Sequence, residues 1–277
     1  MDKKRVLLVS DTHHCHHEWY GVGSEERMER LARHIAEEYE RDPFALILFL
    51  GDYSLDHWKW QIGGSWVAEK RSYTKEWLDR YADRLPPVPY YLLAGNHEQY
   101  GEVLWEQLTG CKRETEVVLG EYLFILWDAY GGELDPDYHH DGVYTPLDVE
   151  RIRQLMAEHA DKRVILCSHH VAIDREQSEQ TAALLADPRI VCLFAGHTHR
   201  ADVRELHGKK VIFTGNYSYC DTAVKGDPRP YMWGFRDLYL DDTGILTRYI
   251  IPENTVTLNG EEVTVPYHVM GGVEIKF

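Results

Sequence analysis

Paired cysteines, long apolar runs and an excess of basic residues are all missing from this sequence. The five cysteines are scattered and never spaced as Cys-x-x-Cys, so neither a disulfide framework nor a cysteine-rich zinc site is indicated. Cys167 and Cys192 lie inside the apolar runs VILCS and VCLFA, where a thiol behaves as a small buried hydrophobic group. The apolar stretch before Asp11 is too short for a signal-peptide core or a membrane span. We therefore expect a cytoplasmic protein without a membrane span.

Acidic residues outnumber basic ones, with 46 Asp and Glu against 30 Lys and Arg and a formal net charge of −16. Contacts with the phosphates of long nucleic acid require clustered basic side chains, so no long nucleic acid is expected as a partner. Anionic membrane surfaces would repel the chain for the same reason. Bound divalent cations would reverse the local field inside a cleft, so a small anionic substrate is not excluded.

Short apolar runs alternate with helical patterns over the first two thirds of the chain. Buried strands are predicted at 5–10, 45–50, 90–94, 164–168 and 190–195. Helices are predicted at 24–39, 65–85, 100–108, 145–159 and 177–186, and an antiparallel hairpin at 117–127. After Gly196, hairpin-like pairs follow at 202–214, 234–251 and 254–268.

The economical interpretation is an α/β fold with two sheets flanked by helices, in a single domain over 1–277. Its motifs would lie within 5–199, followed by an antiparallel β-rich part at 200–277.

Polar side chains follow five of the predicted buried strands directly. They are Asp11 and His13, then Asp52, then Asn96 and His97, then His169, and finally His197 and His199. Ligands of α/β sheets bind at the carboxyl ends of the strands, and buried strands fix the residues at their ends. A single histidine of this kind is usually a hydrogen-bonded structural residue, but five such ends together indicate a site that binds something. Imidazole, carboxylate and amide oxygen suit Mn, Fe, Zn or Ni.

The ordered series D-x-H, G-D, G-N-H-E, H and G-H-x-H, from Asp11 to His199, resembles the calcineurin-like metallophosphoesterases. The resemblance implies a four-layer αββα sandwich of two mixed β-sheets flanked by helices. It also implies two divalent metal ions, of which manganese is favoured. Asp11, His13 and His199 would hold one ion; Asn96, His169 and His197 would hold the other; and Asp52 would bridge them. His169 matches rather than His170 because it comes first after its strand.

The resemblance further implies that His97 lies near the leaving-group oxygen as a catalytic proton donor or charge stabiliser, and that Glu98 orients His97. In such a site a metal-bridging hydroxide attacks phosphorus, and the metals spread the charge of the phosphoryl oxygens. We therefore expect a hydrolase of small phosphomonoesters or phosphodiesters, such as nucleotides. The GDxVDRG element of the Ser/Thr protein phosphatases is absent, since this chain has GDYSLDHW with Asp56 four residues after Asp52, so protein phosphatase activity is not expected.

Several features remain open at this level. A non-catalytic metal-binding interaction module and a nuclease are the alternatives, the nuclease disfavoured by the acidic surface. The aromatic segment 53–77 either packs a helix on the sheet or forms an aromatic wall over a pocket. His14, His16 and His17 are interpreted as solvated residues beside the site. Whether Asn216 and Tyr217 reach the site is also open.

Overall fold

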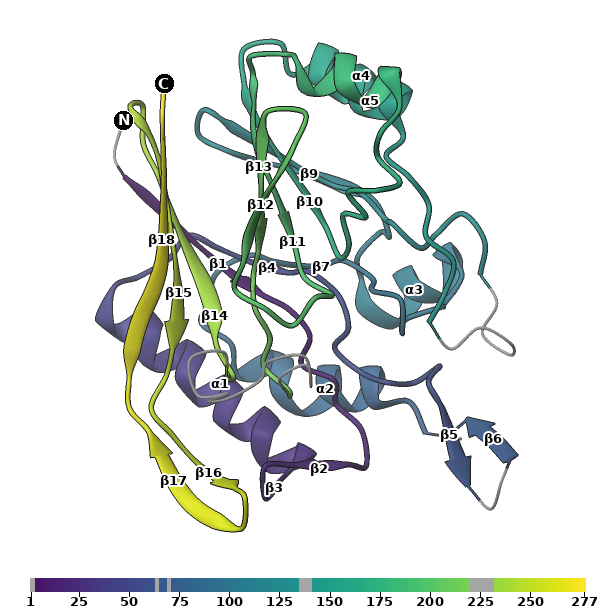
Figure 1. The fold of residues 1–277 in the computed structure, drawn as a ribbon, viewed down its shortest axis with the longest axis vertical. Helices are drawn as coiled ribbons and strands as arrows, with labels where there is room; N and C mark the ends of the chain where they lie inside the picture. Colours follow the sequence, from purple (N-terminus) through teal and green to yellow (C-terminus); the bar gives the residue numbers. More distant parts are fainter. Residues whose placement is uncertain (1–2, 63–64, 69–70, 135–140, 220–231) are drawn as a thin grey trace.

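The computed structural model describes residues 3–62, 65–68, 71–134, 141–219 and 232–277, with the backbone alone at 59–62 and 65–68. Two six-stranded sheets dominate it (Figure 1). The first sheet has the order β18 (His268–Lys276), β15 (Gly244–Ile251), β14 (Phe235–Leu240), β1 (Lys4–Val9), β4 (Leu46–Phe49), β7 (Tyr90–Leu92). The second has the order β12 (Val203–Leu206), β13 (Lys209–Phe213), β11 (Ile190–Ala195), β10 (Arg163–Ser168), β9 (Tyr122–Leu126), β8 (Thr115–Leu119).

Both sheets are mixed. In the first, β1, β4 and β7 are parallel and β14 lies antiparallel beside β1. In the second, β9, β10, β11 and β13 are parallel, and the outer strands β8 and β12 are antiparallel to their neighbours. The C-terminal strands therefore complete both sheets. The assignment of the whole chain to one domain stays a prediction.

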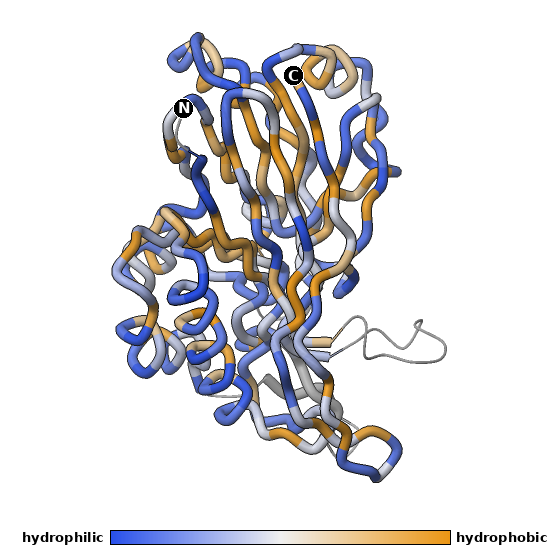
Figure 2. Tube along the Cα trace, turned by 90° about the vertical axis from the view of Figure 1, so that its left-hand side faces the viewer, coloured by the Kyte–Doolittle hydropathy of each residue, from blue (hydrophilic) through white to orange (hydrophobic). Residues whose placement is uncertain are grey.

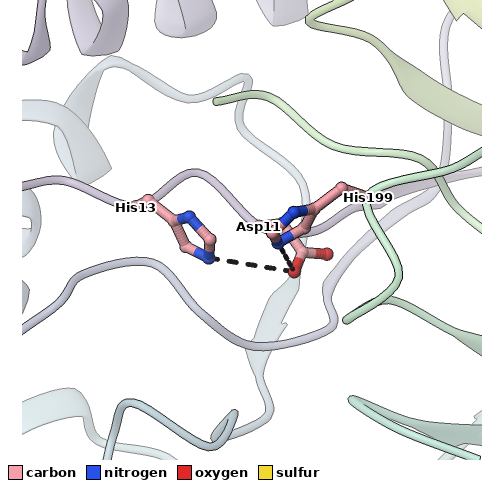
Figure 3. A group of neighbouring side chains, drawn as sticks. All are labelled: Asp11, His13 and His199. Atoms are coloured by element: carbon pink, nitrogen blue, oxygen red, sulfur yellow. Dashed lines mark ion pairs between the residues drawn. The ribbon is translucent and has the colours of Figure 1, made fainter. Parts of the chain in front are cut away.

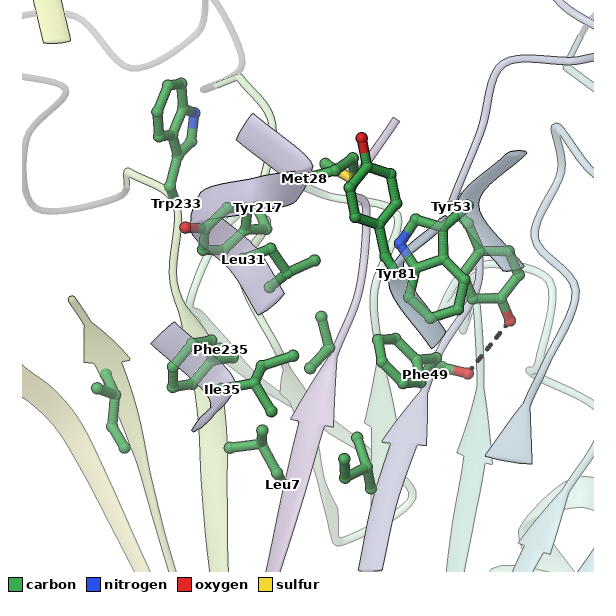
Figure 4. Packing of buried hydrophobic residues seen from close by; sticks show 14 of the residues in the cluster. Leu7, Met28, Leu31, Ile35, Phe49, Tyr53, Tyr81, Tyr217, Trp233 and Phe235 are labelled. Atoms are coloured by element: carbon green, nitrogen blue, oxygen red, sulfur yellow. Dashed lines mark hydrogen bonds between the residues drawn. The ribbon is translucent and has the colours of Figure 1, made fainter. Parts of the chain in front are cut away.

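Alternating side chains of the central strands explain the layers. Leu7 of β1 points to the face covered by α1 (Ser24–Arg41) and α2 (Tyr73–Tyr81), whereas Leu8 points to the other sheet. Figure 4 shows Met28, Leu31 and Ile35 of α1 above the first sheet. The outer face of the second sheet packs under α4 (Val149–Glu158) and α5 (Glu179–Leu185). The predicted four-layer αββα sandwich is confirmed.

Hydropathy follows this arrangement. In Figure 2 the strands between the helices carry much of the apolar colour, and the helix surfaces carry much of the hydrophilic colour. Both faces of the parallel strands are buried, which accounts for their continuous apolar runs. No helix in the described part of the chain is both long and apolar enough to cross a membrane.

The helix predicted at 65–85 is wrong in its first part. Residues Ser65–Ala68 form strand β6, which pairs with β5 (Lys59–Ile62), and α2 begins only at Tyr73. The start of α2 is fixed by two acceptors. The Asp56 carboxylate accepts hydrogen bonds from the backbone N–H groups of Tyr73 (2.7 Å) and Thr74 (3.2 Å), and Ser72 Oγ accepts one from Lys75 N–H. Capping side chains satisfy N–H groups that have no partner within the helix.

Two further boundaries differ from the prediction. The helix predicted from Thr145 begins at Val149, because Asp148 caps it through Arg151 N–H at 2.9 Å, while Thr145 N–H donates to the Ala129 carbonyl. Strand β18 was not predicted beyond residue 268, since two adjacent glycines interrupt its apolar pattern. The short helix α3 (Glu102–Thr109), which ends at the left-handed Gly110, and the hairpin of β8 and β9 agree with the prediction.

The remaining elements are small. Strands β2 (Glu18–Trp19) and β3 (Val22–Gly23) form a short hairpin before α1, and a 3-10 turn (Ala82–Arg84) follows α2. Strands β16 (Asn254–Leu258) and β17 (Glu261–Val265) form a hairpin that reaches the β2–β3 turn, where Thr257 N–H donates to the Tyr20 carbonyl at 2.7 Å. In Figure 1 these two hairpins lie next to each other at one end of the molecule.

Candidate metal centre

The carboxyl ends of β1, β4, β7, β10 and β11 meet between the two sheets, and the polar residues that follow them come together there. Three overlapping groups of histidines and carboxylates have ligand atoms within 4.8 Å of one another. Their members are Asp11, His13 and His199; His13, Asp52 and His97; and Asp52, His169 and His197. Six of the seven predicted ligands belong to these groups, and the seventh, Asn96, contacts the third.

The first group lies at the end of β1 (Figure 3). Oδ1 of Asp11 is 3.2 Å from Nε2 of His199 and 3.9 Å from Nε2 of His13. Asp11 and His13 are buried and His199 is half-buried. One carboxylate and two imidazole nitrogens thus face a common point.

Asp52 connects this group to the other one. Its Oδ2 atom lies 3.3 Å from Nε2 of His13 and 3.2 Å from Nε2 of His169. Oδ1 of Asn96 lies 2.9 Å from Nε2 of His169 and 3.0 Å from Nδ1 of His197. The geometry therefore consists of two ligand sets that share one buried carboxylate.

In two of these imidazoles, the ring nitrogen that faces away from Asp52 contacts an oxygen atom of the protein. Nδ1 of His169 lies 2.7 Å from the Leu50 carbonyl oxygen, and Nδ1 of His13 lies 3.3 Å from Ser218 Oγ. A hydrogen bond at Nδ1 fixes the ring and leaves Nε2 for a metal, as is usual for metal-binding histidines. In both cases Nε2 is the atom that faces Asp52.

The backbone of the site is unusual. The described part of the chain has eight non-glycine residues at positive φ, and five of them are predicted ligands: Asp11, His13, Asp52, His197 and His199, with φ between 45° and 66°. Such residues cost roughly 1–3 kcal/mol each and persist where the surroundings impose them, often at functional sites. Each turn aims a side chain back across the end of its strand.

Two glycines of the motifs lie so close to other atoms that no side chain would fit there. A Cβ atom at Gly95 would collide with the Asp52 carboxylate and backbone nitrogen, and one at Gly196 would collide with Ser10 Oγ and approach Oδ2 of Asp11. Only glycine fits at these two positions without displacing a predicted ligand. The glycine in G-N-H-E and the glycine in G-H-x-H thus have a steric origin.

The electrostatics favour bound cations. Burial opposes ionisation of Asp52, but nearby imidazoles, His169 first, hold its pKa well below the ordinary value. Burial also opposes ionisation of Asp11, and a hydrogen bond from His199 keeps its pKa lowered. Burial lowers the pKa of His13 to about 4 and that of His197 well below its ordinary value, so both imidazoles are neutral and able to bind metal. His169 lies against Asp52 and, despite burial, its pKa is raised to about 9. The negative charge at this centre thus favours a proton on His169. A divalent cation bound there would take the place of that proton.

The donor set fits two divalent ions. Four imidazoles, two carboxylates and an amide oxygen lie within reach of two shared points, and buried carboxylates are otherwise costly. The described cysteines are free, and none belongs to the ligand groups. This chemistry suits Mn, Fe, Zn or Ni. The preference for manganese stays a prediction.

His97 lies at the same centre. Its Nε2 is 3.6 Å from Oδ2 of Asp52 and 3.2 Å from Nδ2 of Asn96, and its backbone N–H donates to Oδ1 of Asp52 at 3.2 Å. The indole of Trp58 meets the His97 ring edge-on, with centroids 5.0 Å apart. His97 thus contacts both the shared carboxylate and Asn96.

Glu98 supports the turn that carries Asp52. Its buried carboxyl accepts hydrogen bonds from the backbone N–H groups of Asp52 and Gly95, both at 2.8 Å, and of Ser54 at 3.0 Å. These bonds fix the turn that carries Asp52; that Glu98 also orients His97 stays a prediction. This contact with the turn could not be foreseen from the sequence, because the N–H groups of Asp52 and Ser54 lie 46 and 44 residues away along the chain.

The four histidines near the site whose roles the sequence left open differ in their surroundings. His14 is not solvated as predicted; it is fully buried, and its Nδ1 lies 2.7 Å from Ser24 Oγ at the start of α1. His16 is exposed and His17 half-buried. His170 stacks on His197 with centroids 4.0 Å apart and hydrogen-bonds through Nδ1 with the hydroxyl of Tyr130 at 2.8 Å.

The loop after β13 reaches the site. Asn216 Nδ2 donates to the His199 carbonyl at 2.9 Å, and Tyr217 N–H donates to the carbonyls of Ser10 and Asp11. Tyr219 lies edge-on to His199 at 4.8 Å. This answers the question left open by the sequence: the loop supports the ligands of the first group.

The described part of the aromatic segment supports the packing interpretation, and the aromatic wall over a pocket stays a prediction. Tyr53, Tyr73 and Trp77 are buried, with Tyr53 and Trp77 in the core under α2, as the packing interpretation expects. Trp58 instead lies against His97 and is half-buried. The side chains of Trp60 and Trp66 are outside the described residues.

Comparison with known proteins agrees with this geometry. A family model described as calcineurin-like phosphoesterase matches residues 4–201. No curated protein sequence matches the chain. A crystal structure of a dimetal phosphatase from Danio rerio is similar at 15% identity and a TM-score of 0.63, over 96% of this chain and 99% of that one.

Two other solved structures share the fold. GAP50, the anchor in the inner membrane complex of Plasmodium, is 13% identical with a TM-score of 0.53, over 96% of this chain and 89% of that one. Purple acid phosphatase PPD1 from yellow lupin, Lupinus luteus, is 16% identical with a TM-score of 0.51, over 90% of this chain and 51% of that one.

Proposed function

The chain belongs to the calcineurin-like phosphoesterase family, and on that premise we propose that it is a dinuclear metal-dependent hydrolase of small phosphoesters. The substrate would be a phosphomonoester or phosphodiester such as a nucleotide. The observation that carries the proposal is the pair of ligand sets sharing Asp52, with His97 3.6 Å from the same carboxylate oxygen.

In this proposal Asp11, His13 and His199 hold one divalent ion, Asn96, His169 and His197 hold the second, and Asp52 touches both. Two such ions supply Lewis acidity toward a phosphoryl group and a water molecule. The protein's own contribution is to keep the ligands in place before substrate arrives. The Glu98 bonds to the Asp52 turn and the Leu50 carbonyl behind His169 do this for the shared set.

His97 is the proposed proton donor. A departing alkoxide needs a proton or a nearby cation, and Nε2 of His97 faces the shared centre from a position that is 7% exposed. Trp58 covers one side of the ring and limits its rotation. The proposal thus assigns His97 as a catalytic imidazole outside the two ligand sets, and Asp52 lies close enough to stabilise its protonated form.

The deciding experiment compares bound metal and turnover for the wild type, Asp52→Asn and His97→Ala on aryl monoesters, aryl diesters and nucleotides. Asp52→Asn should lose metal and with it nearly all turnover. His97→Ala should keep its metal and lose roughly 10²–10⁴-fold in kcat, most on esters with poor leaving groups. His159→Ala, a half-buried histidine at the end of α4, is the control and should match the wild type.

Other outcomes would assign the chain differently. A metal-loaded wild type that hydrolyses none of these esters and is unaffected by His97→Ala would be a binding module on the same fold. Cleavage of long single-stranded or duplex DNA in preference to small esters would make it a nuclease, contrary to the acidic net charge.

A further inference from the structure

A cavity of about 460 Å³ opens beside the second ligand set and shares His197 with it. It is lined by residues of three loops, namely Tyr130, Asp141, Gly142, Tyr144, His170, Ala172, Asp174, Arg175 and His197. The volume lies in the range of small-molecule sites. A phosphoester bound at the metal centre would extend its non-reacting part into this cavity.

The aromatic walls of the cavity are fixed. Tyr130 and His170 have nearly parallel rings, 19° apart, joined by the 2.8 Å hydrogen bond between the Tyr130 hydroxyl and His170 Nδ1. The Tyr144 hydroxyl donates to Glu176 at 2.6 Å and accepts from Ala172 N–H at 3.2 Å. Both tyrosine hydroxyls are therefore engaged by the protein. Tyr130 is buried, so the half-buried rings of Tyr144 and His170 are the aromatic surface that the walls offer to a ligand.

The charges at the cavity favour an uncharged ligand with donors. The lining holds two carboxylates, Asp141 and Asp174, against one guanidinium, Arg175. A second phosphate would meet more negative than positive charge there. Carboxylates accept hydrogen bonds, so a hydroxyl or amino group on a ring would donate to Asp174.

We propose that this cavity binds the alcohol part of the substrate and selects an uncharged ring that carries hydroxyl donors, as in a nucleoside or a sugar. The inference rests on the proposed phosphoesterase function for its place in catalysis, and on the cavity alone for binding. Asp174 and Tyr144 are the specificity-determining residues, and Ala172 marks the floor that such a ring would touch.

The kinetic experiment compares wild type, Asp174→Ala and Ala172→Leu on three substrates: a nucleoside monophosphate, a sugar phosphate and an aryl phosphate without hydroxyl groups. Asp174 is exposed, so its replacement should leave folding intact. For substrates with hydroxyl donors we expect KM to rise about tenfold in Asp174→Ala with little change in kcat, as for loss of one hydrogen bond to a charged group. The aryl phosphate should change less than twofold. Asp161→Ala, which removes an equally exposed carboxylate outside the cavity, is the matched control.

A second experiment needs neither metal nor turnover. Saturation-transfer NMR on the metal-free full chain should detect binding of a free nucleoside or a free sugar, with the signal reduced in Asp174→Ala and Ala172→Leu and unchanged in Asp161→Ala. Whichever of the two ligands responds identifies the source of the ring. Binding of a free ring ligand would support the proposed cavity even if the protein hydrolysed no ester. The absence of hydrolysis would then count only against the phosphoesterase function. Two results would overturn the inference: a loss in Asp174→Ala that is as large on the aryl phosphate as on the two substrates with hydroxyl groups, or no binding of either free ring ligand.

Discussion

The side chain of Arg27 donates a 2.8 Å hydrogen bond to the main-chain carbonyl of His13 and a 3.0 Å bond to that of Thr12. The guanidinium is fully buried, lies over the Trp19 ring at 4.6 Å and has its pKa lowered to about 10 by burial. Helix α1 thereby reaches the D-x-H turn from behind and holds it in its left-handed conformation.

Arg27→Met should weaken binding of the first metal ion about 10- to 100-fold, as loss of a group that orients a ligand does. The two carbonyls left without a donor would also cost about 1–3 kcal/mol of stability. Titration with Mn²⁺ by calorimetry measures the first effect and urea unfolding the second. Arg33→Met, on the exposed side of the same helix, should change neither. Equal metal affinity in the two variants would contradict the role given to Arg27.

Glu98→Gln tests the support of the bridging carboxylate. An amide offers one acceptor oxygen and places an NH₂ group against backbone donors that the carboxyl now satisfies. We expect metal occupancy and kcat to fall together, with a loss of about 1–3 kcal/mol in unfolding free energy. If Glu98 acted through His97 instead, metal content measured by atomic emission would stay at the wild-type level while kcat fell.

Asp56→Ala should destabilise the protein without changing its chemistry. Asp56 caps α2 through Tyr73 and Thr74 and also accepts from the hydroxyl of Tyr100. Loss of a helix cap costs about 0.5–2 kcal/mol, measurable as a lower urea midpoint. Activity per folded molecule should be unchanged, and Asp79→Ala, exposed on the same helix, should be neutral. A drop in kcat at full folding would place Asp56 in the site.

Because His34 is buried, we expect the free energy of unfolding to depend on pH. Burial, with Arg33 and Arg30 nearby, lowers its pKa to about 3, while in the unfolded chain the value is near 6.5. The folded state therefore binds no proton on His34 where the unfolded state does, so stability falls as pH drops below 6.5. At pH 5 this contributes about 2 kcal/mol of destabilisation relative to pH 8.

His34→Gln should remove that slope. Nδ1 of His34 lies 2.6 Å from the Tyr217 hydroxyl, and a glutamine side-chain oxygen could also accept a hydrogen bond from this hydroxyl. Urea unfolding at pH 8, 6.5 and 5 measures the difference between the two proteins. A difference that is constant over this range would show that His34 does not titrate on unfolding.

The predicted ligand residues come together in the structure, and they could be found because their sequence signals are local. A buried strand such as β1 or β10 reads as a continuous apolar run, and the first polar residue after it, Asp11 or His169, is placed by the strand itself. What determines α2 and α4 is less local: Asp56 caps a helix sixteen or more residues away, and Asp148 rather than Thr145 starts its helix because Thr145 is bonded to Ala129.

The supporting residues could not be predicted for the same reason. In the sequence, Arg27 looks like any other charged residue of an amphipathic helix. Only the packing of α1 on the first sheet places its side chain against His13. Ser218 reaches His13 across more than 200 residues of chain. Periodicity and motif spacing contain no information about such contacts.

The position of β14 also sets an order of events during synthesis. Strand β1, which leads to Asp11, lies between β4 and β14, and Tyr217 completes its last turn. A nascent chain that has emerged only as far as residue 201 holds every predicted ligand, but one side of β1 still has unpaired backbone groups. Such an open edge invites pairing with other chains. Tyr217 and strand β14 must therefore be synthesised before β1 is paired on both sides and the predicted metal ligands have their final support.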